Sequence, residues 1–333
     1  MRAIVYTEGG DAAVMRLVDR PVPEPGPGEV RVRIAVSGVN PTDWKARSGG
    51  SSFPEMVPNQ DGAGVIDAVG AGVDASRVGE RVWVWEAADM RADGTAQEYV
   101  AVPARQAVPL GDLSFDVGAS LGIPALTAHR CLTVADGGPD RLAPGALAGR
   151  TVLVAGGAGA VGHAAIQLAA WAGAEVIATV SSDEKARLAS AAGAHHTFNY
   201  RIGDAAERIR ALEPAGVDIV VEVSPAANAE LDAHVVGENA VVACYATDGG
   251  SDVTLPVYAL MRPNVRYQFV LVYTVPDAAK DDAVADVARA AADGALPVGE
   301  DAGLPLHRFP LERTGDAHDA VEGGAVGKVL IDV

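Results

Sequence analysis

A short glycine-rich segment near the middle of the chain carries the clearest chemical pattern. It reads GxGxxG and consists of Gly157, Ala158, Gly159, Ala160, Val161 and Gly162. Because an apolar run precedes it and a helical stretch follows it, the pattern predicts a turn that binds the pyrophosphate of a dinucleotide. We expect Gly157 to allow a tight turn, Gly159 to expose backbone N–H groups and Gly162 to let the helix pack on the strand. The alternative is a glycine-rich turn without a ligand, which this context disfavours.

Residues beyond the next apolar run bear on which dinucleotide would bind. In folds that prefer NAD, an acidic residue about 20 positions further on accepts hydrogen bonds from the ribose. Here Ser181 stands 19 positions after Gly162, as 181 minus 162 gives. A small neutral residue leaves room for the 2′-phosphate of NADP, and we expect Lys185 and Tyr200, with Arg201, to complete that pocket. Two acidic residues between Ser181 and Lys185 favour the alternative, in which Lys185 is an ordinary solvated lysine.

Length, charge and cysteine content exclude several classes of protein. The 333 residues suffice for two domains, since a domain has roughly 150 residues. Acidic residues outnumber basic ones 44 to 26, and the net charge of −18 would repel nucleic acids and anionic membrane surfaces. Cys131 and Cys244 are isolated, and the N-terminus lacks a secretory pattern, so we expect a reduced, cytoplasmic protein. Glycines divide the uncharged stretch Thr151–Ala174 into a strand and a helix, which argues against a membrane span.

The elements that position these residues are indicated by two kinds of sequence pattern. Up to about residue 102 the chain has short β-like runs separated by turn residues, which predicts an irregular β domain. The runs are Ala3–Tyr6, Glu29–Val36, Gly64–Val69, Arg81–Trp85 and Gln97–Val102. From Thr151 onward apolar strands alternate with helical stretches, a pattern typical of a parallel sheet. Its expected strands are Thr151–Ala155, Glu175–Val180, Thr197–Tyr200, Asp218–Val223, Ala240–Cys244 and Val265–Val272.

Five segments resemble the signatures of one family. They are Gly38–Asp43 with Arg47 and Gly49, Asp61–Val65 with Val69 and Gly70, Gly94–Tyr99, Ile123–Ala128, and Val180–Lys185. On these motifs the chain resembles the medium-chain dehydrogenase/reductase superfamily, in its zinc-free quinone oxidoreductase (zeta-crystallin-like) branch. The resemblance covers nearly the whole chain and implies an α/β protein of two domains. A GroES-like β domain would comprise residues 1–123 with 296–333, and a doubly wound Rossmann nucleotide-binding domain would comprise residues 124–295.

Alcohol dehydrogenases of this superfamily carry a catalytic zinc, but the matching positions here hold other side chains. These positions are Asn40, Gln60 and Leu121, and the four-cysteine lobe expected after Val84 is also missing. Zinc prefers thiolate and imidazole ligands, so the sequence predicts no metal site. Without a Lewis acid to polarise a simple ketone, the hydride acceptor should already be electron-poor, such as a quinone or an α,β-unsaturated carbonyl.

The resemblance also implies roles for individual residues. It implies that Asn40 hydrogen-bonds an acceptor oxygen and that Thr127 bonds the nicotinamide carboxamide, although either side chain could instead satisfy turn backbone. Many close relatives have tyrosine at the position of Lys45. This lysine is a candidate proton donor or enolate stabiliser, and a surface lysine is the alternative. Cys244, at a strand end, is a candidate cofactor contact, with packing as the alternative.

One late strand has two candidate roles. We expect a strand over Phe269–Tyr273, which includes Leu271, to lie against the nicotinamide. The same strand could carry a subunit interface, and the resemblance implies a homodimer.

The sequence therefore predicts an NADPH-dependent quinone oxidoreductase that transfers hydride to a small-molecule acceptor without a metal. An NADPH-dependent enone or alkenal double-bond reductase is the alternative within enzymes. From another class, the chain could be a non-catalytic NADPH-binding sensor or crystallin-like protein. In that case Asn40 would be dispensable, whereas Lys185 would still matter.

Overall fold

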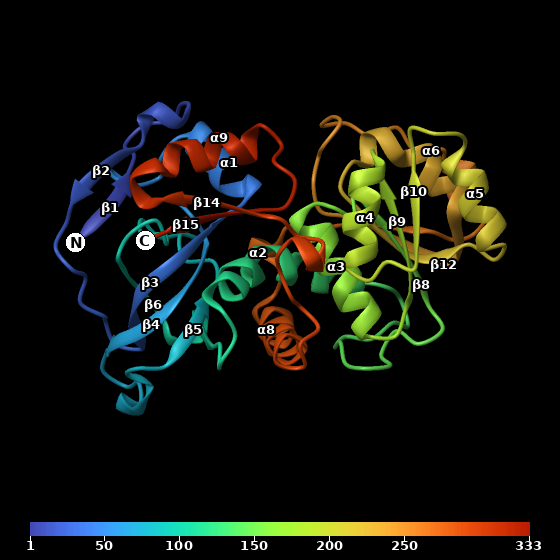
Figure 1. Cartoon of the computed structure of the whole chain (residues 1–333). Coiled ribbons are helices and arrows are strands. Elements are labelled where there is room, and N and C mark those ends of the chain that lie inside the picture. Colours follow the sequence, from blue (N-terminus) through green and yellow to red (C-terminus); the bar gives the residue numbers. More distant parts are fainter. The chain divides into compact units, whose positions relative to one another are not determined.

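The computed structural model describes residues 1–333, which divide into two compact units (Figure 1). Unit 1 comprises Met1–Pro124 and Pro305–Val333, and unit 2 comprises Ala125–Leu304. The second segment of unit 1 begins at Pro305, whereas the expected segment begins at residue 296. The residues between these two positions belong to unit 2 because they hydrogen-bond to other residues of that unit. Nε2 of Gln167 donates to the Pro297 carbonyl oxygen, and a ring nitrogen of His163 lies 2.8 Å from the Ala302 carbonyl oxygen.

A seven-stranded sheet forms the centre of unit 1. Its order is β14-β15-β3-β4-β5-β7, and β6 pairs with β3. The strands are β3 (Glu29–Val39), β4 (Asp61–Val69), β5 (Arg81–Val84), β6 (Tyr99–Pro103), β7 (Ala107–Pro109), β14 (Leu306–Pro310) and β15 (Lys328–Asp332). A separate antiparallel pair consists of β1 (Arg2–Val5) and β2 (Arg16–Asp19). Each of the five β-like runs predicted for this region overlaps a strand, so that prediction is confirmed.

Strand β3 shows how the sequence produces this sheet. Val30, Val32 and Ile34 are buried and alternate with the more exposed Arg31 and Arg33. Successive side chains on a strand point to opposite faces, so one face packs into an apolar core and the other meets water. Two helices complete the part of unit 1 that concerns the site, α1 (Pro41–Gly49) and α9 (Thr314–Glu322), and they pack against each other.

Unit 2 is built on a six-stranded sheet in which all neighbours are parallel. The order is β10-β9-β8-β11-β12-β13. The strands are β8 (Thr151–Ala155), β9 (Glu175–Val180), β10 (His196–Asn199), β11 (Val217–Glu222), β12 (Val236–Cys244) and β13 (Arg266–Phe269). The strand order reverses between β8 and β11, and open parallel sheets bind ligands beyond the carboxyl ends of strands at such a reversal. The predicted doubly wound sheet is confirmed.

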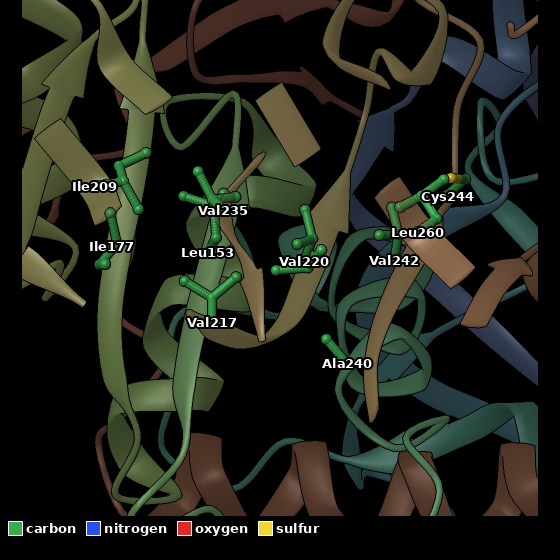
Figure 2. Close-up of a cluster of buried hydrophobic side chains, with 11 residues drawn as sticks. Leu153, Ile177, Ile209, Val217, Val220, Val235, Ala240, Val242, Cys244 and Leu260 are labelled. Atoms are coloured by element: carbon green, nitrogen blue, oxygen red, sulfur yellow. The ribbon is translucent and has the colours of Figure 1, made fainter. Parts of the chain in front are cut away.

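Helices connect or accompany these strands. They are α2 (Phe115–Leu132), which begins in unit 1, α3 (Ala160–Trp171), α4 (Asp183–Ala191), α5 (Ala205–Leu212), α6 (Pro225–Val235), α7 (Val257–Met261) and α8 (Asp277–Ala292). Helix α3 packs on β8 and β9, and α6 packs on β11 and β12. Figure 2 shows one buried cluster of this unit, in which β-branched residues of the strands meet Leu260 of α7 and Cys244 of β12.

The end of the sheet differs from the sequence prediction. Strand β13 stops at Phe269, and a 3₁₀ turn follows at Val272–Thr274, closed by a bond from the Thr274 N–H to the Leu271 carbonyl oxygen. The expected strand over Phe269–Tyr273 is therefore wrong, because the chain folds back on itself where the pattern predicted extension. No helix of the structure is long and apolar enough to cross a membrane.

Candidate active site

The glycine-rich turn connects β8 to α3. Gly156 has a φ of +70°, a left-handed conformation that favours glycine, so this residue makes the tight turn. The GxGxxG pattern predicted that role for Gly157, and this prediction is wrong. Gly157 is needed for packing instead, because a Cβ there would lie 2.9 Å from the Cβ of Ala178 in β9. A Cβ at Gly162 would lie 2.4 Å from the Gly156 carbonyl oxygen, so glycine lets α3 approach the turn.

The first turn of α3 is open to a ligand. Gly159 is the N-cap and has no side chain to accept the N–H groups of Ala160, Val161 and Gly162. Only the Gly156 carbonyl oxygen, at 3.5 Å, lies near the position that a Cβ of Gly159 would take. Unpaired N–H groups and the helix dipole favour an anion at such an end. The backbone here therefore fits a pyrophosphate, and Ala158 in the same turn is buried.

Two adjacent strand ends bring together the residues expected near a 2′-phosphate. Ser181 follows β9 and Tyr200 follows β10, and the Tyr200 N–H donates to the Val180 carbonyl oxygen at 3.0 Å. Oγ of Ser182 accepts the N–H of Lys185, so the serine caps α4 and places Lys185 in its first turn. Tyr200 is 48% exposed. Ser181 and Tyr200 thus lie just beyond the carboxyl ends of two neighbouring strands, where the first turn of α4 begins.

Two other expected cofactor contacts in unit 2 have contrasting environments. Cys244 ends β12, and its side chain is buried in the cluster of Figure 2. Burial, and then the nearby Glu222 and Asp232, raise the pKa of this thiol to about 12. Leu271 lies outside the sheet and is 57% exposed. Thr127, on the segment of α2 that belongs to unit 2, is buried.

The side chain of Asn40 is held on both sides within unit 1. Asn40 precedes α1 and is only 2% exposed. Its Nδ2 donates to Oδ2 of Asp61 at 2.7 Å, and its Oδ1 accepts from Nζ of Lys328 at 2.7 Å. Its backbone N–H donates to Oδ2 of Asp43 at 2.6 Å. Asn40 is therefore the centre of a buried polar network, which we call the Asn40 network: Asn40, Asp43, Asp61 and Lys328.

Strand register explains why residues so distant in sequence meet here. Strand β15 pairs with β3 so that Val329 is opposite Val39, which places Lys328 beside Asn40. Strand β3 pairs with β4 so that Gly38 is opposite Asp61. In the sequence, Asp61 is part of a family motif, and Lys328 was not predicted as a site residue. Lys328 directly precedes the apolar run at 329–331, and this pattern could have indicated a buried lysine. A buried ammonium needs a partner, so the pattern would also have predicted a polar group beside it.

Asp61 also contacts a break in helix α2. At Gly122 the backbone leaves the helical conformation, with φ −30° and ψ −108°. The N–H of the next residue, Ile123, donates to Oδ1 of Asp61 at 2.9 Å. A Cβ at Gly122 would lie 2.0 Å from the same oxygen, so the carboxylate occupies the space that glycine leaves. Asp61 therefore joins the Asn40 network to the start of the Ile123–Ala128 motif.

Three ionisable groups share the Asn40 network. Burial, and then the neighbouring Asp61, raise the pKa of Asp43 to about 8. Burial also raises the pKa of Asp61, and burial lowers the pKa of Lys328. Nζ of Lys328 lies 3.7 Å from Oδ2 of Asp61, so each charge favours the charged form of the other and offsets part of the effect of burial.

Lys45 lies apart from this network. It is exposed on α1, with its ammonium 5.7 Å from the centre of the Trp44 ring. Neighbouring Asp43 and Arg47 on the same helix are buried. The structure therefore brings Asn40 to the buried start of α1 and leaves Lys45 on its exposed surface.

Positions that match zinc ligands in the superfamily are engaged in other contacts. Both polar atoms of Asn40 are bonded as described, and Oε1 of Gln60 accepts the N–H of Ala88 at 3.0 Å. Leu121 is a buried apolar residue. The structure contains no group of three or more His, Cys, Asp or Glu side chains that could hold a metal. These donors do not fit the ligand set that zinc prefers.

Unit 2 holds a second buried acidic group, which the sequence analysis missed. Glu222 ends β11 and Asp232 lies in α6, and both are 0% exposed. Glu222 accepts the backbone N–H of Ser224 and, at 2.9 Å, Nδ2 of Asn228. No amide, hydroxyl or cationic donor contacts the oxygens of Asp232, whose carboxyl is instead in hydrogen-bond contact with Glu222. Burial raises the pKa of both carboxyls, and Glu222 raises that of Asp232 further.

Comparison with known proteins gives relatives for both units. Residues 26–112 match the family model "Alcohol dehydrogenase GroES-like domain", and residues 160–289 match "Zinc-binding dehydrogenase". A quinone oxidoreductase of Rattus norvegicus is 34% identical over 253 residues, which cover 73% of each protein.

Several solved structures cover 100% of this chain and 100% of their own chain, and two of these are 30% identical to it. A mycobacterial protein complexed with NADPH is 30% identical with a TM-score of 0.81, and an NAD-dependent alcohol dehydrogenase is 30% identical with a TM-score of 0.87. Together with the matching folds of the two units, these similarities identify the family. The chain belongs to the medium-chain dehydrogenase/reductase superfamily, in its quinone oxidoreductase branch.

Proposed function

We propose that this protein is an NADPH-dependent quinone oxidoreductase that transfers hydride without a metal. The observation that carries the proposal is the Asn40 network, in which an amide held by Asp61 and Lys328 replaces a zinc ligand. An amide N–H can stabilise developing negative charge on an acceptor oxygen, but it cannot polarise a carbonyl as strongly as a metal ion. This favours acceptors that are already electron-poor, and the name of the rat relative supports quinones among them.

Unit 2 would hold the cofactor. The N–H groups at the start of α3 would bind the pyrophosphate, because the turn from Gly156 to Gly159 presents them without a capping side chain. Ser181, Lys185 and Tyr200 would receive the 2′-phosphate, since no acid occupies the end of β9 and a lysine stands one turn away. The two solved neighbours differ in cofactor, and these residues of this chain favour NADPH.

The protein's part in the reaction would be to position groups and to donate hydrogen bonds. When bound, NADPH supplies the hydride. Asn40 would donate to the acceptor oxygen, and Thr127 would bond the carboxamide of the nicotinamide. Cys244 and Leu271 remain candidate cofactor contacts, the former through its strand end rather than its buried thiol. Water could deliver the proton, with Lys45 as the candidate side-chain donor.

An apolar surface in unit 2 supports the expected homodimer. Strand β13 is at the edge of the sheet, so one side of its backbone is unpaired. Large exposed apolar side chains gather on β13, on the turn after it and on α7: Val257, Tyr258, Met261, Phe269 and Leu271. A second copy that paired along β13 would cover both features. Light scattering of the purified protein should give the mass of two chains, and Phe269→Glu should halve it.

The cysteines support a cytoplasmic location. Cys131 and Cys244 are both free and buried, as expected of a protein from a reducing compartment. Fractionation of cells that express the full chain, followed by thiol labelling of the denatured protein, tests this. Two reactive thiols in the cytoplasmic fraction are the expected result, and recovery outside that fraction would contradict the proposal.

A panel of acceptors tests the proposed reaction. Quinones, enones, alkenals, simple ketones and, in the reverse direction, alcohols are assayed with NADPH and with NADH, before and after exhaustive chelation. We expect quinone reduction with NADPH that survives chelation, and little oxidation of simple alcohols.

Other outcomes would assign other functions. Faster turnover of enones than of quinones, with a large loss in Lys45→Ala, would favour a double-bond reductase. Tight NADPH binding without turnover of any acceptor would favour the non-catalytic alternative. Loss of activity on chelation, restored by zinc, would overturn the metal-free part of the proposal.

A further inference from the structure

Lys328 is an unusual residue of unit 1. It is a lysine with 1% exposure, at the first position of a strand that is otherwise apolar up to Asp332. Burying an ammonium is costly unless it is paired and hydrogen-bonded. Yet Nζ makes its short contact, 2.7 Å, with the amide oxygen of Asn40 and stands 3.7 Å from the nearest carboxylate oxygen, that of Asp61. The ammonium therefore makes its shorter contact with the amide and a longer one with the carboxylate.

The two contacts of Asn40 determine which way its amide points. Oδ1 faces the ammonium of Lys328, and Nδ2 faces the carboxylate of Asp61. Rotating the amide by half a turn would place an NH₂ group against an ammonium and an oxygen against a carboxylate. Both contacts would be repulsive, so only the observed orientation is stable. In that orientation one Nδ2 hydrogen is bonded to Asp61, and the second has no acceptor within the protein.

The backbone is arranged to admit the lysine. A Cβ at Gly38 would lie 3.1 Å from Cε and 3.2 Å from Nζ of Lys328, so the side chain passes over a glycine. Pairing of β15 with β3 fixes where the lysine starts, and Asp61 is held by the Ile123 N–H. Groups that are fixed in advance of binding lose less entropy when they act.

We propose that Lys328 is a positioning residue for the reaction. With Asp61 it holds the Asn40 carboxamide so that an N–H, and not the carbonyl oxygen, is offered to the substrate. The network therefore selects substrates that present a hydrogen-bond acceptor, such as a quinone or carbonyl oxygen, at that point. The inference rests on the proposed role of Asn40.

A double-mutant cycle tests the proposal. Lys328→Met keeps an unbranched stem and removes the donor, and Asn40→Ala removes the amide. We expect Lys328→Met to lower kcat/KM for a quinone about ten- to hundredfold, while the Kd of NADPH stays within about twofold of the wild-type value. Because Lys328 acts through Asn40, the double variant should be no worse than Asn40→Ala alone. Independent, multiplicative losses would overturn the proposal, as would wild-type kinetics in Lys328→Met.

Two controls separate positioning from stability. Arg77 of unit 1 donates to the carbonyl oxygens of Ala104 and Ala107, so Arg77→Met removes a partly buried cation outside the Asn40 network. It should lower Tm and leave kcat/KM for the quinone within about twofold of wild type. If Lys328→Met does not fold, the cycle is run on Asp61→Asn/Lys328→Met, which removes both charges. Rates close to wild type in that charge-balanced variant would overturn the proposal.

A spectroscopic measurement distinguishes failure of this inference from failure of the proposed reaction. In protein labelled with ¹⁵N-asparagine, the side-chain NH₂ signal of Asn40, assigned by its loss in Asn40→Ala, reports the amide directly. We expect two resolved, slowly exchanging hydrogens in wild type, and averaged or shifted signals in Lys328→Met. If wild type reduces no acceptor but this difference is seen, the proposed function fails and the positioning by Lys328 stands. An unchanged signal would overturn the positioning.

Discussion

Each unit contains a pair of neighbouring buried carboxyl groups, and the two pairs have different surroundings. In unit 1, Asp43 and Asp61 lie near the ammonium of Lys328 and accept several N–H groups. In unit 2, Glu222 accepts two donors, Asp232 accepts none, and neither forms an ion pair. A buried acid can be stabilised by a counter-charge or by keeping its proton. The pair in unit 1 has the ammonium of Lys328 beside it as well as the raised pKa of Asp43, whereas the pair Glu222 and Asp232 in unit 2 has no cation and depends on protonation.

The two groups also differ in their relation to the candidate site. Asn40, the expected substrate contact, is a member of the buried network of unit 1. Ser181, Lys185 and Tyr200, the expected phosphate contacts, lie at the ends of β9 and β10, separated from β11 and Glu222 by β8. Stability and function should therefore be coupled in unit 1 and separable in unit 2.

Removing the counter-charge of unit 1 should have the largest effect. Lys328→Met leaves Asp61 buried without a cation, and breaking a buried pair in this way costs about 3–5 kcal/mol. We expect a loss of that size in the free energy of unfolding at pH 7, measured by urea denaturation. Asp61→Asn/Lys328→Met should recover part of it, because neither charge then remains. A loss below about 1 kcal/mol in the single variant would show that the ion pair is not needed.

Lys185→Ala should change cofactor binding without changing stability. A charge-assisted contact with the 2′-phosphate contributes about 1.5–3 kcal/mol, which is about one to two decades in Kd. Fluorescence titration should show that loss for NADPH and no comparable loss for NADH. Thermal unfolding without cofactor should match wild type. Equal Kd values for the two cofactors in wild type would refute the assignment of Ser181 and Lys185.

Asn40→Ala should change activity and stability together. It removes the amide that bonds Asp61 and Lys328, so both charged groups lose a hydrogen-bond partner. We expect kcat/KM for quinones to fall by about 1–3 kcal/mol of barrier, and the free energy of unfolding to fall by a similar amount. NADPH affinity should stay close to wild type. Full activity with lowered stability would limit Asn40 to a structural role.

Local sequence patterns predicted those parts of the molecule that depend on neighbouring residues. The strand runs and the glycine-rich turn are local, and the structure has them. The assignment to Gly157 failed because two glycines are adjacent and the sequence does not show which one has a positive φ. The structure gives the positive φ to Gly156, and it places Gly157 against Ala178 of another strand.

Longer-range features were harder to predict. Asn40, Asp61 and Lys328 meet through the register of three strands, and register depends on how distant segments pair. The acidic pair of unit 2 joins a strand end to a later helix turn in the same way. The end of strand β13 was predicted too late. The apolar residues that lead into the turn at Val272–Thr274 are also typical of a strand, so the pattern did not indicate the turn. The motifs therefore located the candidate site, and only the fold identified the residues that support it.

Asp232→Asn should have the smallest effect, and its direction tests the contrast between the units. The folded state raises the pKa of Asp232 well above its unfolded value through burial and the nearby Glu222. Folding therefore favours the protonated form, so this contribution to stability is complete below the unfolded pKa and is lost as pH rises toward the folded pKa. An amide needs no proton and can donate to Glu222. We expect Asp232→Asn to be about 1 kcal/mol more stable than wild type at pH 8 and to lose that advantage near pH 4. Urea denaturation across this range measures the difference, and a variant that is less stable than wild type at pH 8 would mean that Asp232 is stabilised in its charged form.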